Sequence, residues 1–114
     1  MKTDVRKIGT VDIFTPVGPL VDADAQSFCN ALLARLSGDS GGARIGVAMQ
    51  EVPYMDSIAL EGLLGATKAL GERATCLKLA GVTPTCREIF ELTGLAPRFR
   101  FFKDVEDIVK SFLT

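Results

Sequence analysis

Hydrophobic and polar residues alternate in a way that divides the first third of the chain into two short strands and a helix. Two short predicted strands, 5–8 and 11–14, each with apolar residues at both ends, flank Gly9-Thr10, and a two-residue connection that contains glycine is typical of a β-hairpin. Between 25 and 36, apolar residues recur every three or four positions and form one continuous face. This spacing predicts an amphipathic helix packed against a core.

The remaining two thirds alternate between short apolar runs and amphipathic segments. The run 45–49 is almost entirely apolar, which is typical of a strand buried on both faces in a parallel sheet. The segments 76–80 and 99–102 are the next predicted strands. Amphipathic segments follow all three, and they predict helices that begin near Asp56 or Ser57, at Pro84 and after Asp104.

The residues at the predicted helix ends support these boundaries. Thr83 is expected to cap the third helix, with Pro84 at its first position, and Gly94 to supply the left-handed residue that follows it. Leu95 is then expected to fold back onto Phe90. The other predicted boundary residues are Asp22 or Asp24 at the start of the first helix, Gly71 at the end of the second and Asp104 at the start of the fourth.

The resulting order of elements is β-β-α-β-α-β-α-β-α, which predicts one α/β domain over residues 1–114. A hairpin followed by strand–helix alternation predicts a mixed, mostly parallel sheet with right-handed crossovers. Four helices are available to cover this sheet. The residues that we expect to point from these helices onto the sheet include Leu32, Leu63, Ile89 and Val109.

Composition limits the functions that such a domain can have. Of the 114 residues, 47% are hydrophobic and 24% are charged, as in ordinary soluble globular domains. The net charge of −1 provides no basic excess to neutralise phosphates, so we expect no nucleic-acid partner. The chain has no histidine, which removes the commonest general base and most zinc sites.

The sequence also lacks the motifs of common catalytic sites. Neither GxGxxG nor GxxxxGK[ST] is present, and Ser57 does not lie in a GxSxG motif. We therefore expect a binding module and not an enzyme, with no cofactor and no metal.

The three cysteines and the lengths of the apolar runs indicate the cellular compartment of the protein. Cys29, Cys76 and Cys86 form no CxxC pair and lie in apolar patterns, so we expect buried thiols in a reducing cytosol. No apolar run approaches the length of a membrane span. These features predict a cytoplasmic protein without a membrane partner.

Asp56-Ser57 is the most informative pair, because it follows a buried strand and opens a helix. The Ser57 hydroxyl would lie among the free N–H groups of the first helical turn. Aspartate and serine are also the best N-cap residues, so capping alone can account for the pair. From these residues alone, capping is the better explanation.

The residues around this pair resemble a known family. The segment 52–60, VPYMDSIAL, resembles the signature of STAS domains, the anti-sigma factor antagonist family, in which an apolar residue precedes Asp-Ser-Ser/Thr-Gly-Leu. The segment 18–36 is similar to the first turn and helix of these domains, 79–95 to their second half, and 102–109 to their closing strand-to-helix passage. The resemblance covers essentially the whole chain.

The resemblance implies a mixed four- to five-stranded sheet with helices mainly on one side, and a regulatory switch in bacterial signalling. In classical members of this family, a partner anti-sigma factor that is also a serine kinase phosphorylates the serine after the motif aspartate, and a PP2C-type phosphatase reverses the modification. The unphosphorylated form binds the kinase and frees the sigma factor. The phosphoacceptor carries over to Ser57, and the implied partner-binding residues are Asp22, Asp56, Ser57, Ile58, Ala59 and Glu61.

The same residues leave a second function open. Ile58 and Ala59 stand where the motif has Ser/Thr and Gly, and Val21 and Ala48 stand where the family often has aspartate. The alternative is a STAS module that is not phosphorylated and serves as a scaffold or accessory subunit, in a signalling complex or beside a transporter. We expect a monomer or a weak dimer in either case.

Overall fold

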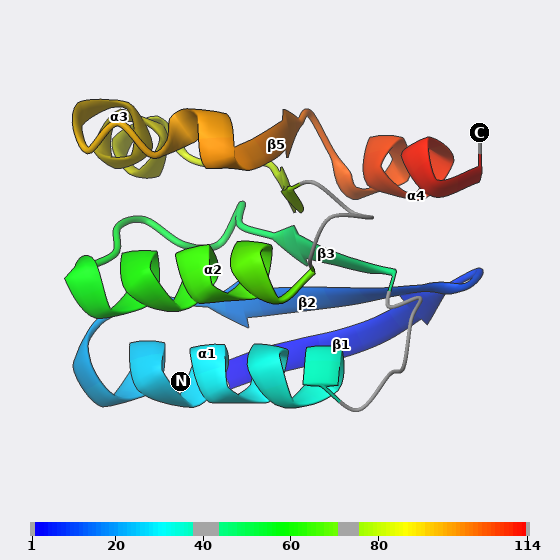
Figure 1. Cartoon of the computed structure of the whole chain (residues 1–114), viewed down its shortest axis with the longest axis horizontal. Coiled ribbons are helices and arrows are strands. Elements are labelled where there is room, and N and C mark those ends of the chain that lie inside the picture. The colour runs from blue at the N-terminus through cyan, green and yellow to red at the C-terminus, as the bar shows by residue number, and fades with distance from the viewer. Residues whose placement is uncertain (1, 38–43, 71–75, 114) are drawn as a thin grey trace.

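The computed structural model describes residues 2–37, 44–70 and 76–113, and all the predicted strands and helices are present in these ranges (Figure 1). The strands are β1 (Lys2–Ile8), β2 (Val11–Val17), β3 (Ile45–Ala48), β4 (Leu77–Ala80) and β5 (Phe99–Phe102). The helices are α1 (Asp22–Ser37), α2 (Ser57–Ala69), α3 (Pro84–Leu92) and α4 (Val105–Leu113), with a 3-10 turn, η1 (Ala96–Arg98), before β5.

The strands form one sheet in the order β1-β2-β3-β4-β5. β1 and β2 are antiparallel and meet at the predicted two-residue turn, where Gly9 has a φ of 64° that favours glycine. The other neighbouring strands are parallel. The predicted mixed, mostly parallel sheet is therefore confirmed.

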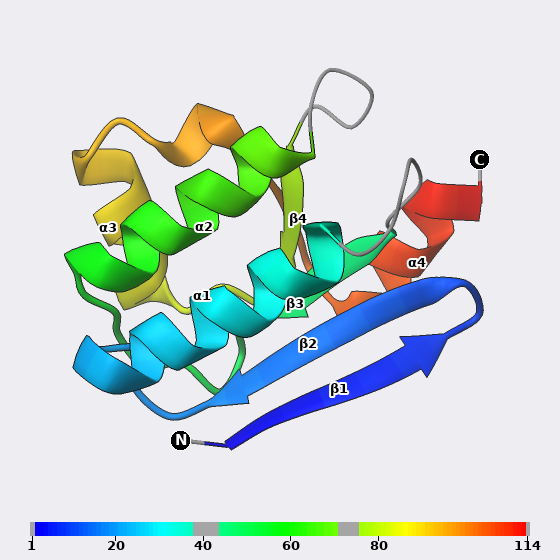
Figure 2. The same ribbon diagram turned by 60° about the horizontal axis from the view of Figure 1, so that its bottom comes forward.

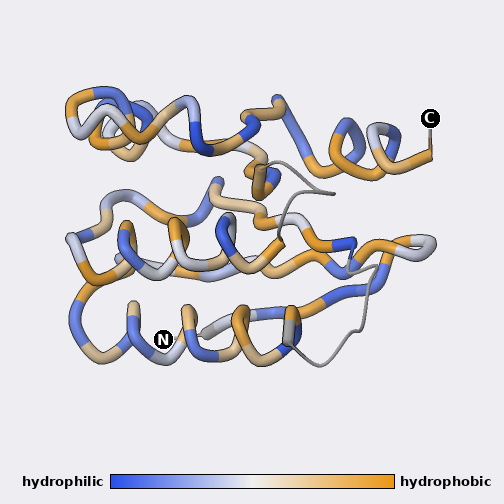
Figure 3. Tube along the Cα trace, in the orientation of Figure 1, coloured by the Kyte–Doolittle hydropathy of each residue, from blue (hydrophilic) through white to orange (hydrophobic). Residues whose placement is uncertain are grey.

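Two apolar cores lie on opposite faces of this sheet. The larger core fills the space between the sheet and α1, α2 and α3, and includes Phe28 and Phe90. In the smaller core Ile108 of α4 packs on the other face, against Val11, Ile13, Ala48 and Ala80. Figure 2 shows α1 and α2 side by side in front of the strands, and in Figure 3 apolar and polar residues alternate along the helices. The helices thus cover mainly one side, as expected.

The four residues that were expected to point onto the sheet do so from both of its faces. Leu32 and Leu63 are fully buried in the larger core, and Ile89 is half-buried against it. Val109 is half-buried against the smaller core. The fourth helix therefore approaches the sheet from the side opposite to the other three.

The largest difference from the predicted boundaries is the length of the hairpin strands. β2 continues through Pro16 to Val17, three residues beyond the predicted strand at 11–14. Pro16 lies opposite Thr3 of β1, and β2 pairs with β3 only through residues 12–14. The missing N–H of Pro16 therefore interrupts no ladder with β3, and the strand can include a proline.

The end of α3 has the predicted geometry. Gly94 has a φ of 74°, and its N–H donates to the carbonyl of Glu91 at 3.1 Å. The Leu95 N–H donates to the carbonyl of Phe90 at 3.0 Å, and Leu95 packs against the core that contains Phe90. These two hydrogen bonds and the contact form a Schellman motif.

The predicted starts of three helices have different outcomes. Asp104 caps α4, because its Oδ1 accepts the N–H of Asp107 at 3.0 Å. Thr83 is the N-cap residue of α3 with Pro84 after it, as predicted, but its hydroxyl donates to the carbonyl of Val52 at 2.9 Å and makes no hydrogen bond to the helix start. Asp22 is itself the first residue of α1. The predicted stop of α2, Gly71, lies outside the described residues.

Close packing of α1 on α2 depends on a glycine. A methyl group added at Gly62 of α2 would overlap the Sγ and Cβ atoms of Cys29 in α1. Gly65 lies in the same helix, and a methyl group there would meet open space. The same substitution at these two positions therefore separates helix packing from helix propensity.

We predict that Gly62→Ala lowers the free energy of unfolding by about 1–3 kcal/mol, because the added methyl overpacks the α1–α2 contact. Gly65→Ala is the matched control, and should be neutral or stabilising by up to about 1 kcal/mol, because alanine is the better helix former. Chemical denaturation followed by circular dichroism measures both. Equal effects of the two substitutions would show that α1 and α2 do not pack as described.

Candidate functional site

The loops after β2 and β3 lie side by side and bring the starts of α1 and α2 together. The Leu20 N–H donates to the carbonyl of Tyr54 at 3.1 Å, and the Asp56 N–H donates to the carbonyl of Leu20 at 3.0 Å. Leu20 and Met55 form a parallel bridge, and both side chains are buried. The two loops therefore continue the parallel pairing beyond the sheet.

The carboxylate of Asp56 joins the two helix starts. Its Oδ1 accepts the N–H of Ala59 at 3.1 Å, which caps α2. Its Oδ2 accepts the N–H of Asp22, the first residue of α1, at 2.8 Å. Asp22 has a φ of 50°, a left-handed conformation that is uncommon for a residue with a side chain. Asp56 thus holds α1 and α2 at a fixed distance at their N-termini.

These hydrogen bonds determine the charge of the Asp56 carboxylate, which joins the two helix starts. The bond from the Asp22 N–H is the largest cause that lowers the pKa of Asp56 below its usual 3.8, and the bond from Ala59 acts in the same direction. Asp56 is therefore ionised at neutral pH. Below it, burial and then the charge of Asp56 raise the pKa of the Cys29 thiol to about 11, so this thiol is neutral and unreactive.

The cysteines fit the expectation only in part. All three are free thiols, and Cys29 and Cys86 are buried as predicted. Cys76 is half-buried, which differs from the prediction, because it precedes the first residue of β4 and lies outside the core.

Most of the residues predicted for partner binding are exposed near the starts of α1 and α2. Ser57 is the first residue of α2 and is exposed, and Ile58 is 37% exposed. Asp22 and Glu61 are exposed as well. Ala59 is fully buried, with its N–H bonded to Asp56. The prediction that Ala59 contacts a partner is therefore wrong, because its side chain faces the core.

Tyr54 is a candidate contact that sequence reasoning missed. It is the only tyrosine of the chain, directly precedes the buried Met55, and is 49% exposed. Its carbonyl accepts the Leu20 N–H, so the backbone at this position is fixed. The signal in the sequence that could have identified it is an aromatic residue directly before the motif residues Met55-Asp56-Ser57, because aromatic residues are enriched at interfaces.

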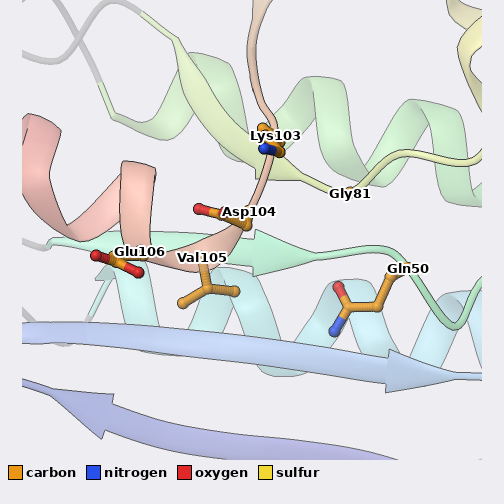
Figure 4. Close-up of a pocket in the computed structure, with 6 residues that line it drawn as sticks. All are labelled: Gln50, Gly81, Lys103, Asp104, Val105 and Glu106. Atoms are coloured by element: carbon orange, nitrogen blue, oxygen red, sulfur yellow. The ribbon is translucent and has the colours of Figure 1, made fainter.

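An open depression lies on the other face of the sheet, at the carboxyl ends of β3, β4 and β5. Figure 4 shows the residues that line it: Gln50, Gly81, Lys103, Asp104, Val105 and Glu106. None of these residues belongs to the predicted site. The Asp56 carboxylate lies on the α1–α2 side of the sheet, and the depression lies beside the start of α4.

Two classes of site are absent from the described residues. Residues 2–37, 44–70 and 76–113 contain no cluster of Cys, Asp and Glu side chains that could hold a metal ion. In the same ranges, no helix has both the length and the apolar character needed to cross a membrane.

Comparison with known proteins identifies the fold. The model of the STAS domain family matches residues 2–108. A comparison with curated protein sequences returned no match.

Three solved structures are similar over most of the chain. An anti-sigma factor antagonist from Mycobacterium paratuberculosis has 20% sequence identity and a TM-score of 0.82, covering 99% of this chain and 94% of that one. The Bacillus cell fate determinant SpoIIAA in its phosphorylated form has 19% identity and a TM-score of 0.71, covering 96% and 99%. A sulfate transporter family protein from Wolinella succinogenes has 19% identity and a TM-score of 0.72, covering 89% and 83%.

We predict that the contribution of Asp56 to stability disappears in acid. Its folded pKa is below its usual value, so its contribution is complete above pH 3.8 and is lost as the pH falls from there through the lower folded pKa. Denaturation of the wild type and of Asp56→Asn should therefore show a difference at neutral pH that disappears in acid. A difference that stays constant down to about pH 2 would contradict the assigned hydrogen bonds.

Proposed function

The chain belongs to the STAS domain family, and we propose that it is a regulatory protein-binding module that acts in the manner of an anti-sigma factor antagonist. The proposal is supported chiefly by the position of Ser57, an exposed hydroxyl at the first residue of a helix that the Asp56 carboxylate caps. The docking surface, which we call the α2 corner, consists of Asp22, Tyr54, Asp56, Ser57, Ile58 and Glu61.

The chemistry of the α2 corner suggests the surface that it binds. Asp22, Asp56 and Glu61 give it negative charge, and a basic partner surface would complement that charge. Ile58 and Tyr54 add exposed apolar area that a partner can bury. The partner that we propose is an anti-sigma factor with serine kinase activity, and a phosphatase would reverse the modification.

Phosphorylation of Ser57 would change this surface without a change of fold. A phosphate adds a charge of about −1.5 to −2. The N-terminus of α2 favours an anion, so the phosphorylated helix can remain intact. The new charge lies beside the ionised Asp56, and a partner would have to desolvate both groups. Binding therefore weakens while the domain stays folded.

A constitutive scaffold or accessory subunit is the second candidate function. Ile58 takes the place of the second hydroxyl of the family motif and exposes an apolar side chain in the α2 corner. Such a side chain supports docking that needs no modification. In this case Ser57 would serve as a rim residue of a permanent interface.

We predict that incubation with ATP and an anti-sigma factor kinase adds one phosphate to the wild type and none to Ser57→Ala, as measured by intact mass. Ser57→Ala should bind the kinase constitutively, and Ser57→Asp should bind it more weakly, because even one added charge must be desolvated next to Asp56. Neither substitution should change stability by more than about 0.5 kcal/mol, since Asp56 and not Ser57 caps α2.

Two further variants separate the switch from the docking surface. Ser27→Ala removes an exposed serine of α1 and should leave both phosphorylation and binding unchanged. Ile58→Asp should abolish binding with a nearly unchanged melting temperature, because Ile58 is partly exposed. If Ser57→Ala and Ser57→Asp bind equally and Ile58→Asp does not bind, the scaffold is the correct function. Binding by all three variants would disprove the docking surface.

A further inference from the structure

The free edge of β1 is the largest unpaired backbone surface among the described elements. β1 pairs with β2 on one side, and Figure 2 shows no described helix or strand beyond its other side. Four consecutive residues, Asp4, Val5, Arg6 and Lys7, are exposed, and Val5 is 57% exposed. Natural edge strands are usually short or covered, because their free N–H and C=O groups attract another strand. A seven-residue open edge is therefore unusual.

The hairpin determines which backbone groups are free. A two-residue hairpin is closed by a hydrogen-bonded pair, here Ile8 and Val11, and hydrogen-bonded and non-bonded pairs alternate from there. The even-numbered residues of β1 therefore bond to β2. Thr3, Val5 and Lys7 direct their N–H and C=O groups to the open edge, where a second strand can bond to them.

The side chains of β1 are complementary to a second copy of β1 in one register. We propose that two copies of this chain associate through antiparallel pairing of their β1 strands, with Val5 opposite Val5. This register places Asp4 opposite Arg6 of the second copy, and the two-fold symmetry repeats the pair. Both pairs lie at non-hydrogen-bonded positions, where opposite side chains are closest.

Neighbouring symmetric registers bring like charges together. A shift that centres the pairing on residue 4 places Asp4 opposite its own copy, and a shift that centres it on residue 6 does the same for Arg6. Like charges directly opposite each other destabilise a sheet. Among the described residues, neither Asp4 nor Arg6 forms an ion pair within its own chain. Both charges are therefore available to a second copy.

The two faces of the joined sheet also fit this arrangement. Asp4 and Arg6 line an open depression with Ile8, Ile13, Thr15, Gln50 and Val105, on the α4 side of the sheet. Val5 lies opposite Phe14, on the α1 side, and would bury its exposed surface against the second Val5. The edge of one strand is a small interface, so the dimer should be weak and reversible. The α2 corner lies at the starts of α1 and α2, beyond the ends of β2 and β3, and is not part of the β1 edge.

Sedimentation velocity of the full chain from about 10 μM to about 1 mM tests this proposal in the range expected for a small interface. The wild type should form a reversible dimer. Asp4→Arg alone and Arg6→Asp alone should each weaken dimerisation by about tenfold or more, because two attractive pairs become two repulsive ones. An equimolar mixture of the two variants should form a heterodimer, and the variant with both substitutions should dimerise like the wild type.

Two control substitutions test whether the β1 edge itself forms the dimer interface. Glu88→Arg makes the same charge change as Asp4→Arg at an exposed position of α3 and should leave dimerisation unchanged. Val5→Pro removes an N–H that faces the open edge, so it should abolish the dimer without loss of β1–β2 pairing. A wild type that stays monomeric up to about 1 mM would overturn the proposal. A dimer whose stability does not change in the charge-reversal variants would also overturn it. If Val5→Pro fails to fold, the charge-reversal variants alone test the proposal.

Discussion

The Asp56 carboxylate accepts backbone N–H groups from the starts of two different helices, and the geometry of the α2 corner depends on these two bonds. One oxygen caps α2, and the other holds the Asp22 N–H and with it the left-handed start of α1. Further along the same pair of helices, Gly62 allows α2 to lie close to Cys29. A polar contact at one end and a small residue in the interface thus fix α1 against α2.

In this arrangement some residues of the 52–60 motif are buried in the core and others lie on the surface. Met55 and Ala59 are buried under the corner, while Ser57 and Ile58 remain exposed. A modification at Ser57 therefore changes the surface but does not enter the core.

The β1 edge is part of the same sheet but lies away from the α2 corner, so association of two copies would present two corners to partners.

Local patterns in the sequence predicted the elements and their order, because the spacing of apolar residues reflects which face of a helix is buried. The Schellman end at Gly94 and the Asp104 cap were predictable because each involves residues close in sequence. Contacts between residues that are distant in the sequence were not predictable. The ion pair of the buried Asp12 with Arg35 and the bond from Asp22 to Asp56 form only once the sheet has placed their elements together. Ala59 was misassigned for the same reason, since its burial in the larger core depends on elements distant in the sequence.

Amide hydrogen exchange, measured by NMR on the wild type and Asp56→Ala, tests most directly whether one carboxylate holds both helix starts. The Asp22 and Ala59 amides should be protected in the wild type, and both should exchange faster in the variant. The Asp107 amide, which Asp104 caps in α4, should be unaffected and serves as the internal reference. Loss of protection at Ala59 with an unchanged Asp22 would show that Asp56 is an ordinary helix cap and that something else joins α1 to α2.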